Sequence, residues 1–281
     1  MNYTFIFLII FGGILAIYSL WENYNPKLTI YNLKINLPKN IKNLSILHIS
    51  DLHNTGFGLK QEKLKRLIKK DYDLIFITGD LIDRRYLGLE NAKDLIIFLA
   101  EKYKDKIYFV SGNHEKGSLE YSKLEKLLKK LNIKILNNDK IFYNENIDIV
   151  GIEDPAKYTS INKKTSNNES KIIETQLKKL INPEKTNLLL SHRPEVFELY
   201  CKYNVDLVFS GHSHGGQVKI FNRGLLAPDQ GFFAKYCGGV FKKDNTIMVN
   251  SRGLGNNFPW AKRVFNRPHL VEVNLTSLVE L

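Results

Sequence analysis

Five short apolar segments of this chain are each followed directly by side chains that can bind a metal ion or move a proton. The segments are Leu44–Ser50, Leu74–Thr78, Ile107–Ser111, Leu188–Ser191 and Leu207–Ser210. Apolar runs of this length are typical of strands buried on both faces. The residues that follow them, in the same order, are Asp51-Leu52-His53, Gly79-Asp80, Gly112-Asn113-His114-Glu115, His192 and Gly211-His212-Ser213-His214. Because ligands bind outside the carboxyl ends of strands in open α/β sheets, we expect all five groups to meet in one crevice.

The rest of the chain beyond Pro26 alternates further strands with amphipathic helices. Helices are predicted at Glu90–Glu101, Leu119–Leu131, Ile172–Leu180 and Glu195–Tyr203. Further strands are predicted at Leu28–Leu37, Ile147–Gly151, Gln217–Phe221, Thr246–Val249 and Leu270–Asn274. This order predicts a layered α/β domain with largely buried sheets, and the alternating Leu28–Leu37 strand is expected at an edge. The polar, unpatterned tract Lys157–Lys171 is interpreted as a surface loop.

The candidate ligands share a chemistry that suits divalent transition metals. They are Asp51, His53, Asp80, Asn113, His192, His212 and His214. Imidazole, carboxylate and amide oxygen favour Mn, Fe, Zn or Ni, and no thiolate demands a softer ion. Seven donors are too many for one ion, so the set suits two ions that share a bridging carboxylate. Glycines at Gly79, Gly112 and Gly211 are expected to let the backbone turn sharply away from the metals.

Each group also has an ordinary structural explanation when it is considered alone. An Asp-Leu-His sequence is typical of a helix cap or turn, and Gly-Asp is typical of a turn. Five such groups in order, each after a buried strand, favour the metal site over five separate turns. His48 lies inside a strand and His269 follows a proline, so both are interpreted as core or surface residues.

Together these motifs resemble the signature of the calcineurin-like metallophosphoesterase family, which reads D-x-H, G-D, G-N-H-E, a single histidine and G-H-x-H. The resemblance covers about Ser45 to Val273. It implies a four-layer α/β/β/α sandwich with two metal ions at the edge of the sheets. The first ion would be held by Asp51, His53, Asp80 and His214, and the second by Asp80, Asn113, His192 and His212. In such enzymes His114 binds no metal and faces the substrate.

Within that family the chain is most similar to a membrane-associated subgroup. The similarity rests on Gly211–Gln217 (GHSHGGQ), on Ser251–Gly255 (SRGLG) and on Phe265–Pro268 (FNRP). This subgroup contains enzymes that resemble UDP-2,3-diacylglucosamine pyrophosphatases of lipid A synthesis, as well as broad-specificity phosphodiesterases. The resemblance therefore implies a phosphoesterase and leaves the substrate open between these classes.

The N-terminal segment predicts attachment to a membrane. No charged residue occurs between Tyr3 and Trp21, a stretch about long enough to cross the ~30 Å hydrocarbon layer. A cleaved signal peptide is not favoured, because no basic residue precedes the stretch and Ala16-Ile17-Tyr18 is a poor cleavage site. The downstream lysines predict a cytoplasmic catalytic domain. We divide the chain into an anchor (1–22), a connecting segment with the edge strand (23–43) and a phosphoesterase domain (44–281).

Net charge and cysteine content exclude several other classes. The 281 residues include 41 Lys and Arg against 29 Asp and Glu, a formal net charge of +12. No nucleic-acid-binding motif accompanies this charge, whereas attraction to anionic lipid headgroups fits it, so nucleic acid is not the expected partner. Cys201 and Cys237 are too few for a disulfide framework and are expected to be free thiols. No obligate protein partner is indicated.

The leading hypothesis is a membrane-anchored, metal-dependent hydrolase of phosphate ester or pyrophosphate bonds. Its expected cofactor is a pair of divalent ions, Mn²⁺ first, with Fe, Zn, Ni or Mg as alternatives. Because a soluble substrate needs no tether, a lipid-linked phosphorylated substrate such as UDP-2,3-diacylglucosamine is expected. His114 is the expected proton donor to the leaving oxygen. The alternatives are a phosphodiesterase, phosphatase or nuclease for soluble substrates, and a metal-binding membrane scaffold without turnover.

Two further sets of residues are candidates for substrate contact. Guanidinium groups match phosphate oxygens, so we consider Arg193, Arg252, Arg263 and Arg267 as substrate-binding residues, with a structural or solvated role as the alternative. The aromatic pair Phe232-Phe233, together with Phe258-Pro259-Trp260, is interpreted either as an apolar lip for acyl chains or as core.

Overall fold

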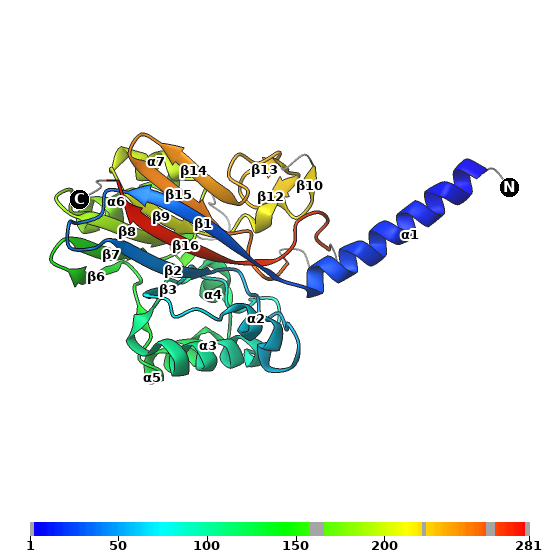
Figure 1. Cartoon of the computed structure of the whole chain (residues 1–281), viewed down its shortest axis with the longest axis horizontal. Coiled ribbons are helices and arrows are strands. Elements are labelled where there is room, and N and C mark those ends of the chain that lie inside the picture. The colour runs from blue at the N-terminus through cyan, green and yellow to red at the C-terminus, as the bar shows by residue number, and fades with distance from the viewer. Residues whose placement is uncertain (1–2, 158–165, 221–222, 257–261, 279–281) are drawn as a thin grey trace.

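The computed structural model describes residues 3–157, 166–220, 223–256 and 262–278. A long N-terminal helix, α1 (Tyr3–Tyr24), projects away from the body of the protein (Figure 1). It has 22 residues, and only 6% of its most apolar stretch is buried against the body. At about 1.5 Å per residue the helix is about 33 Å long, which matches the ~30 Å hydrocarbon layer of a bilayer. By length and composition, α1 is a candidate membrane span.

The body contains two six-stranded sheets, two small hairpins and six further α-helices within the described residues. The first sheet consists of β1 (Lys27–Ile35), β2 (Asn43–Ile49), β3 (Leu74–Ile77), β4 (Ile107–Phe109), β5 (Lys134–Ile135) and β16 (His269–Ser277). The second consists of β6 (Asp139–Asn144), β7 (Ile147–Ile152), β8 (Thr186–Ser191), β9 (Leu207–Ser210), β14 (Gly239–Lys243) and β15 (Thr246–Asn250). The hairpins pair β10 (Lys219–Ile220) with β11 (Arg223–Gly224), and β12 (Leu226–Ala227) with β13 (Gly231–Phe232).

The helices of the body are α2 (Glu62–Leu67), α3 (Glu90–Tyr103), α4 (Asn113–Gly117), α5 (Tyr121–Lys130), α6 (Ser166–Leu180) and α7 (Phe197–Lys202). Short 3₁₀ helices occur at Leu59–Gln61, Lys104–Lys106, Pro155–Lys157 and His214–Gly216. Most of these helices connect one strand to the next, as expected for crossovers between parallel strands.

Parallel strands form the centre of both sheets. The first sheet has the order β1-β16-β2-β3-β4-β5, and the second has the order β14-β15-β9-β8-β7-β6. Strands β2 to β5 run parallel to one another, as do β15, β9, β8 and β7. The carboxyl ends of the parallel strands therefore meet at one edge of each sheet, where the loops that follow them can converge.

The sheets and helices stack in four layers. One apolar core lies between the two sheets and includes Ile46, Phe76 and Val249. A second core fills the space between the first sheet and its helices, with Leu95 of α3 as an example, and a third packs Ile173 of α6 against the second sheet. This arrangement confirms the α/β/β/α sandwich implied by the sequence motifs. Strand β1 lies at the edge of its sheet beside β16, as its alternating pattern predicts.

Two of the predicted elements need correction. The tract Lys157–Lys171 is not a loop throughout, because α6 begins at Ser166, while residues 158–165 lie outside the described part of the chain. The first turns of α6 carry no apolar stripe for periodicity to detect. The predicted strand Gln217–Phe221 reduces to Lys219–Ile220 among the described residues, because Gln217 has a φ of +57° that interrupts an extended chain.

A substitution at Gly151 can test how closely β7 packs against the segment that follows β5. A Cβ atom at this position would lie 2.1 Å from the backbone oxygen of Leu136 and 2.3 Å from its Cβ. We expect Gly151→Ala to lower the free energy of unfolding by about 1–3 kcal/mol in urea denaturation, as overpacking does. Gly56→Ala is the matched control, because its Cβ would meet only the Asn91 side chain at 3.1 Å or beyond. Equal stability of the two variants would contradict this packing.

Candidate metal centre

The five polar groups predicted from the sequence converge where the two sheets meet. Loops from the first sheet hydrogen-bond directly to loops from the second: the backbone nitrogen of His212 donates to Asp51 Oδ1 at 3.0 Å, and His192 Nδ1 lies 2.7 Å from the carbonyl oxygen of Thr78. Within the first sheet, the backbone nitrogen of His114 donates to Asp80 Oδ1 at 2.8 Å. Six of the seven predicted ligands are buried, Asn113 being the partly exposed one.

The backbone of this site is unusual for residues that carry side chains. Five of the predicted ligands have positive φ angles between 47° and 63°, namely Asp51, His53, Asp80, His212 and His214. The left-handed region costs a non-glycine residue of the order of 1 kcal/mol or more, and such strain clusters at functional sites. The tight turns aim these side chains inward, whereas an unstrained continuation of each strand would carry them past the site.

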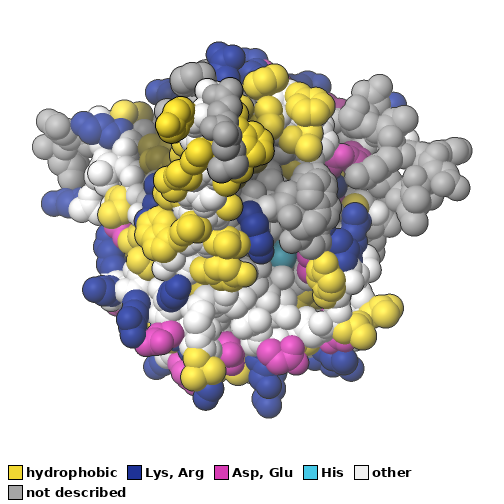
Figure 2. Space-filling model, turned by 90° about the vertical axis from the view of Figure 1, so that its right-hand side faces the viewer, with side chains coloured by type: hydrophobic (Ala, Val, Ile, Leu, Met, Phe, Trp, Pro, Cys, Tyr) yellow, Lys and Arg dark blue, Asp and Glu magenta, His cyan; other side chains and the backbone are white. Residues whose placement is uncertain are grey.

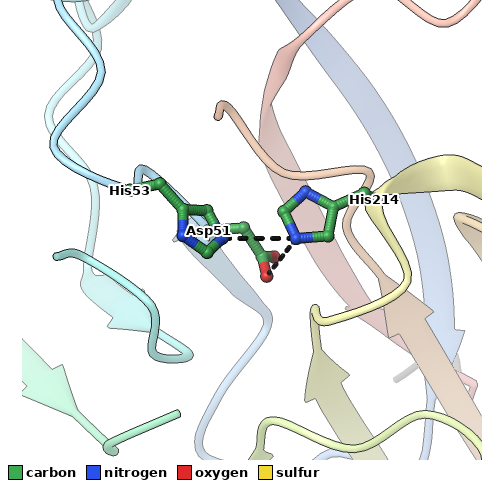
Figure 3. A group of neighbouring side chains, drawn as sticks. All are labelled: Asp51, His53 and His214. Atoms are coloured by element: carbon green, nitrogen blue, oxygen red, sulfur yellow. Dashed lines mark hydrogen bonds and ion pairs between the residues drawn. The ribbon is translucent and has the colours of Figure 1, made fainter. Parts of the chain in front are cut away.

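One group of neighbouring donors consists of Asp51, His53 and His214, whose side chains point toward a common centre (Figure 3). The two Nε2 atoms of His53 and His214 lie 3.2 Å apart, and His214 Nε2 lies 3.6 Å from Asp51 Oδ1. Asp80 is close to this group as well, with its Oδ2 3.7 Å from His53 Nε2.

The second group contains Asp80, Asn113, His192 and His212. Nε2 of His192 lies 3.2 Å from Asp80 Oδ2, 3.2 Å from Asn113 Oδ1 and 3.2 Å from His212 Nδ1. The same Asp80 oxygen therefore faces both groups. Among the predicted ligands it is the one whose position suits a bridge between two ions.

The spacing of these donors fits metal binding. Two ligands at about 2.0–2.1 Å from a tetrahedral ion are separated by about 3.4 Å, and the distances within the two groups run from 3.2 to 3.7 Å. Burial lowers the pKa of a histidine, yet the charges of Asp80 and Asp51 raise the pKa of His192 to about 10. At His53 and His214 burial dominates and lowers the pKa, so the carboxylates favour a positive charge most clearly beside His192. The clustered imidazoles and carboxylates are able to hold metal ions.

Comparison with known families agrees with this geometry. Residues 44–216 match the model of the calcineurin-like phosphoesterases. The chain belongs to this family. The relatives are named metallophosphoesterases, and the protein is accordingly a metal-dependent hydrolase of phosphoester bonds.

Relatives of this phosphoesterase carry the same kind of name. An uncharacterized metallophosphoesterase of Campylobacter jejuni is 30% identical over 93% of this chain and 68% of its own length. An uncharacterized metallophosphoesterase of Aquifex aeolicus is 28% identical over 93% of this chain and 96% of its own length. A transmembrane protein with metallophosphoesterase domain from zebrafish, Danio rerio, is 25% identical over 88% of this chain and 57% of its own length. The phosphopantetheinyl hydrolase of Mycobacterium tuberculosis has 12% identity over 80% of this chain and 96% of its own, with a TM-score of 0.47.

Three histidines of the phosphoesterase site are fixed through the ring nitrogen that faces away from the centre. His192 Nδ1 contacts the carbonyl oxygen of Thr78 at 2.7 Å, and His214 Nδ1 contacts that of Gly255 at 3.2 Å. His212 Nε2 lies 3.0 Å from Asp229 Oδ2. Such partners fix the tautomer and the ring orientation of metal-binding histidines. Thr78 and Gly255 contribute only backbone atoms, so no residue-type pattern could have revealed them.

The glycines of the motifs serve two different purposes. Gly79 has a φ of +86° and makes the sharp turn that the sequence predicts. Gly112 and Gly211 do not adopt a left-handed conformation. They are needed for space instead, because a Cβ at Gly211 would lie 1.9 Å from Ser50 Oγ and one at Gly112 would lie 2.2 Å from Asp80 Oδ1.

Two carboxylates beside the ligands were not assigned a role from the sequence. Glu115 is fully buried and accepts hydrogen bonds from the backbone nitrogens of Asp80, Leu81 and Gly112 at 2.7–2.8 Å, so it ties two ligand loops together. Asp83 Oδ1 lies 3.1 Å from His114 Nδ1. Both residues lie close to motifs in the sequence, since Glu115 ends the G-N-H-E motif and Asp83 follows Gly79-Asp80 by three residues. Their hydrogen-bond partners, however, become known only from the fold.

The four candidate substrate arginines are engaged within the protein. Arg193 is buried and pairs with Asp154 and Asp229, each with a contact of 2.5 Å. Arg263 is also buried and donates to backbone carbonyl oxygens, including that of Arg252 at 2.7 Å. Arg252 Nη2 lies 3.1 Å from His269 Nδ1, and Arg267 donates to the backbone of Asn25. All four have structural contacts, and a direct contact with substrate stays a prediction.

The remaining sequence interpretations have mixed outcomes. His48 and His269 are both core residues with no exposed surface. Cys201 and Cys237 are free thiols, as expected, and both are buried. Phe232 and Phe233 are not core, because 73% and 61% of their surfaces are exposed. The segment Phe258-Pro259-Trp260 lies outside the described residues.

Asp80 provides the test of the bridging position. Because its carboxylate faces both donor groups, Asp80→Asn should reduce the bound metal to a small fraction of the wild-type content when measured by elemental analysis after dialysis. Asp105→Asn, at an exposed acidic residue of the same sheet's connections, is the matched control and should keep the wild-type content. Unchanged metal content in the Asp80 variant would exclude a bridging role.

Proposed function

We propose that this protein is a membrane-anchored phosphoesterase with two metal ions that hydrolyses a phosphate ester or pyrophosphate bond of a lipid-linked substrate, with UDP-2,3-diacylglucosamine as the example. The observation that supports the lipid most directly is the exposed apolar helix α1 joined to the hydrolase body. Transmembrane proteins with metallophosphoesterase domains occur among the relatives, in zebrafish and in Bos taurus.

The proposed metal ligands follow the two donor groups. Asp51, His53, Asp80 and His214 would hold the first ion, and Asp80, Asn113, His192 and His212 the second. When bound, the ions neutralise phosphate oxygens and lower the pKa of water toward 7. Mn²⁺ is our first choice because the donors are imidazoles, carboxylates and one amide oxygen, without a thiolate.

His114 is the proposed proton donor to the leaving oxygen. Its Nδ1 lies 3.1 Å from Asp83 Oδ1, and its ring packs edge-on against that of His53 with centroids 4.5 Å apart. These contacts hold the ring at the rim of the metal centre and leave Nε2 as the atom that can carry a proton to substrate. Hydrogen bonds from His114, His53 and Arg85 outweigh the effect of burial and lower the pKa of Asp83, which keeps this carboxylate charged beside the ring.

The proposed topology places α1 across the bilayer as a single-pass anchor and the catalytic body on the cytoplasmic side. Lysines at positions 27, 34, 39 and 42 follow the helix on the side of the body, and basic residues near a span favour the cytoplasmic side. The net charge of +12 also suits a body that lies close to anionic headgroups.

Substrate hydrolysis by the full-length protein in phosphatidylcholine vesicles tests the proposal. With Mn²⁺ we expect turnover of bis-p-nitrophenyl phosphate, and a higher kcat/KM for UDP-2,3-diacylglucosamine than for DNA or soluble nucleotides. Chelation with EDTA should abolish activity and added Mn²⁺ should restore it. No turnover of any substrate by metal-loaded protein would instead support a scaffold, whereas preference for the soluble substrates would support a soluble-substrate phosphodiesterase, phosphatase or nuclease.

His114→Ala separates catalysis from metal binding. Loss of a positioned proton donor typically reduces the rate by about 10²–10⁴-fold, so kcat should fall in this range while elemental analysis finds the wild-type metal content. The fall in kcat should be smaller for a substrate whose leaving group needs no proton, such as p-nitrophenolate. A kcat close to the wild-type value, with the metals present, would refute the role assigned to His114.

A further inference from the structure

A small pocket lies between the end of the membrane helix and the metal centre. Its volume is about 190 Å³. Asn23 and Tyr24 of α1 line one side, and His53 and Asp83 of the metal centre line another. The rim includes two cations and an aromatic residue, namely Lys262, Arg85 and Tyr86. The last turn of the proposed anchor is therefore part of the wall beside the catalytic groups.

Hydrogen bonds connect this wall, through Arg263, to the loop that carries the proposed metal ligand His214. Ser19 Oγ and Asn23 Nδ2 donate to the backbone oxygen of Arg263 at 2.8 and 3.0 Å, and the backbone nitrogen of Arg263 donates to Asn23 Oδ1 at 3.1 Å. The buried guanidinium of Arg263 donates to the oxygen of Gly255, which His214 Nδ1 also contacts. Because α1 and His214 share this network, the pocket keeps a set distance from the metal centre.

The body meets α1 at the level where a bilayer ends. Ser19, Glu22 and Asn23 are buried against the body, whereas the preceding turns are exposed. Aromatic and cationic side chains typical of membrane interfaces surround this junction: the Arg267 guanidinium lies 5.1 Å from the Trp21 ring, and the rings of Tyr18 and Phe265 are 5.6 Å apart. The face from which α1 projects therefore lies at the headgroup level.

Figure 2 looks onto this face. Histidine (cyan) is visible near its centre, with Lys and Arg side chains (blue) and apolar side chains (yellow) beside it. His53 of the metal centre lines the same pocket as Asn23 and Tyr24 of α1, so the metal centre is reached from the side of the molecule that α1 faces. Tyr86, which is 57% exposed, lines the pocket, and Phe265, which is 56% exposed, packs against Tyr18 of α1.

Two cations line the pocket, and one of them, Arg85, is already paired with Asp83. The other, Lys262, forms no ion pair with a carboxylate of the described residues, and its Nζ lies 5.5 Å from the centre of the Tyr24 ring. Its charge is therefore available to a phosphate that enters the pocket. A volume of about 190 Å³ is below the ~300 Å³ at which pockets begin to enclose drug-sized ligands, so it suits the phosphate part of a headgroup and leaves the acyl chains outside.

We propose that this pocket receives the phosphate-bearing headgroup of a bilayer lipid, while the acyl chains stay in the bilayer beside α1. Lys262 binds the phosphate, and the end of α1 forms the wall that guides the headgroup to the metal centre. The inference rests on the proposed function and adds to it the path of the substrate: the lipid enters from the membrane side and never leaves the bilayer completely.

Kinetics of Lys262→Ala in the full-length protein provide the first test. Loss of a charged hydrogen bond costs about tenfold in affinity, so KM for UDP-2,3-diacylglucosamine in phosphatidylcholine vesicles should rise about tenfold more than KM for bis-p-nitrophenyl phosphate. Lys39→Ala is the matched control, because Lys39 is an exposed lysine that lines a pocket beyond the opposite end of β1. Equal changes in KM for the two substrates, or no change for the lipid, would overturn the inference.

A spin label tests the position of the pocket without relying on hydrolysis. Cys201 and Cys237 are buried, so a nitroxide reacts selectively with Tyr86→Cys or with the control Lys39→Cys. In phosphatidylcholine vesicles, adding phosphatidic acid should immobilise the label at position 86 and leave position 39 unchanged, whereas inorganic phosphate should affect neither.

Immobilisation by inorganic phosphate alone would identify a soluble anion as the ligand, and no response to phosphatidic acid would exclude a headgroup site. Both results would overturn the inference. If the wild type hydrolyses no substrate, the proposed function fails, and the response of the label still decides whether the pocket binds a lipid headgroup.

Discussion

Buried negative charge at the meeting point of the two sheets is the constraint on which the site depends. Asp51 and Asp80 have almost no exposed surface, and burial of an ionised carboxylate is costly unless cations compensate it. The nearby imidazoles lower the pKa of Asp80 well below its usual range. Metal ions provide the same compensation more completely, and this requirement explains why so many nitrogen and oxygen donors face one small volume.

The convergence of these donors requires backbone strain at the site and hydrogen bonds that maintain it. Left-handed backbone conformations at five candidate ligands are unfavourable by themselves, so the surrounding contacts must hold them. Glu115 of α4 does so by accepting three short backbone hydrogen bonds, and the contact between His192 and Thr78 connects the loops of the two sheets. The same rigidity reaches α1 through Arg263, which joins the end of the apolar helix to the loop of His214.

Much of the fold and site could be predicted because their signals are local. Each buried strand is a short apolar run, and each candidate metal ligand lies within a few residues of a strand end, so order and residue type suffice to locate them. Asp83, Asp229 and the Arg263 network escaped prediction for the opposite reason. Ser19 and Arg263 are 244 positions apart, and Asp229 approaches His212 from a separate hairpin.

The family, the set of candidate ligands and the apolar helix can be recognised from the residues alone, because each depends on short local motifs or on one uninterrupted apolar stretch. Only the tertiary structure decided that four candidate substrate arginines have structural contacts, that Asp80 faces both donor groups and that a pocket joins α1 to His53. These properties depend on distances between side chains from different layers, and such distances exist only after the two sheets have packed against each other.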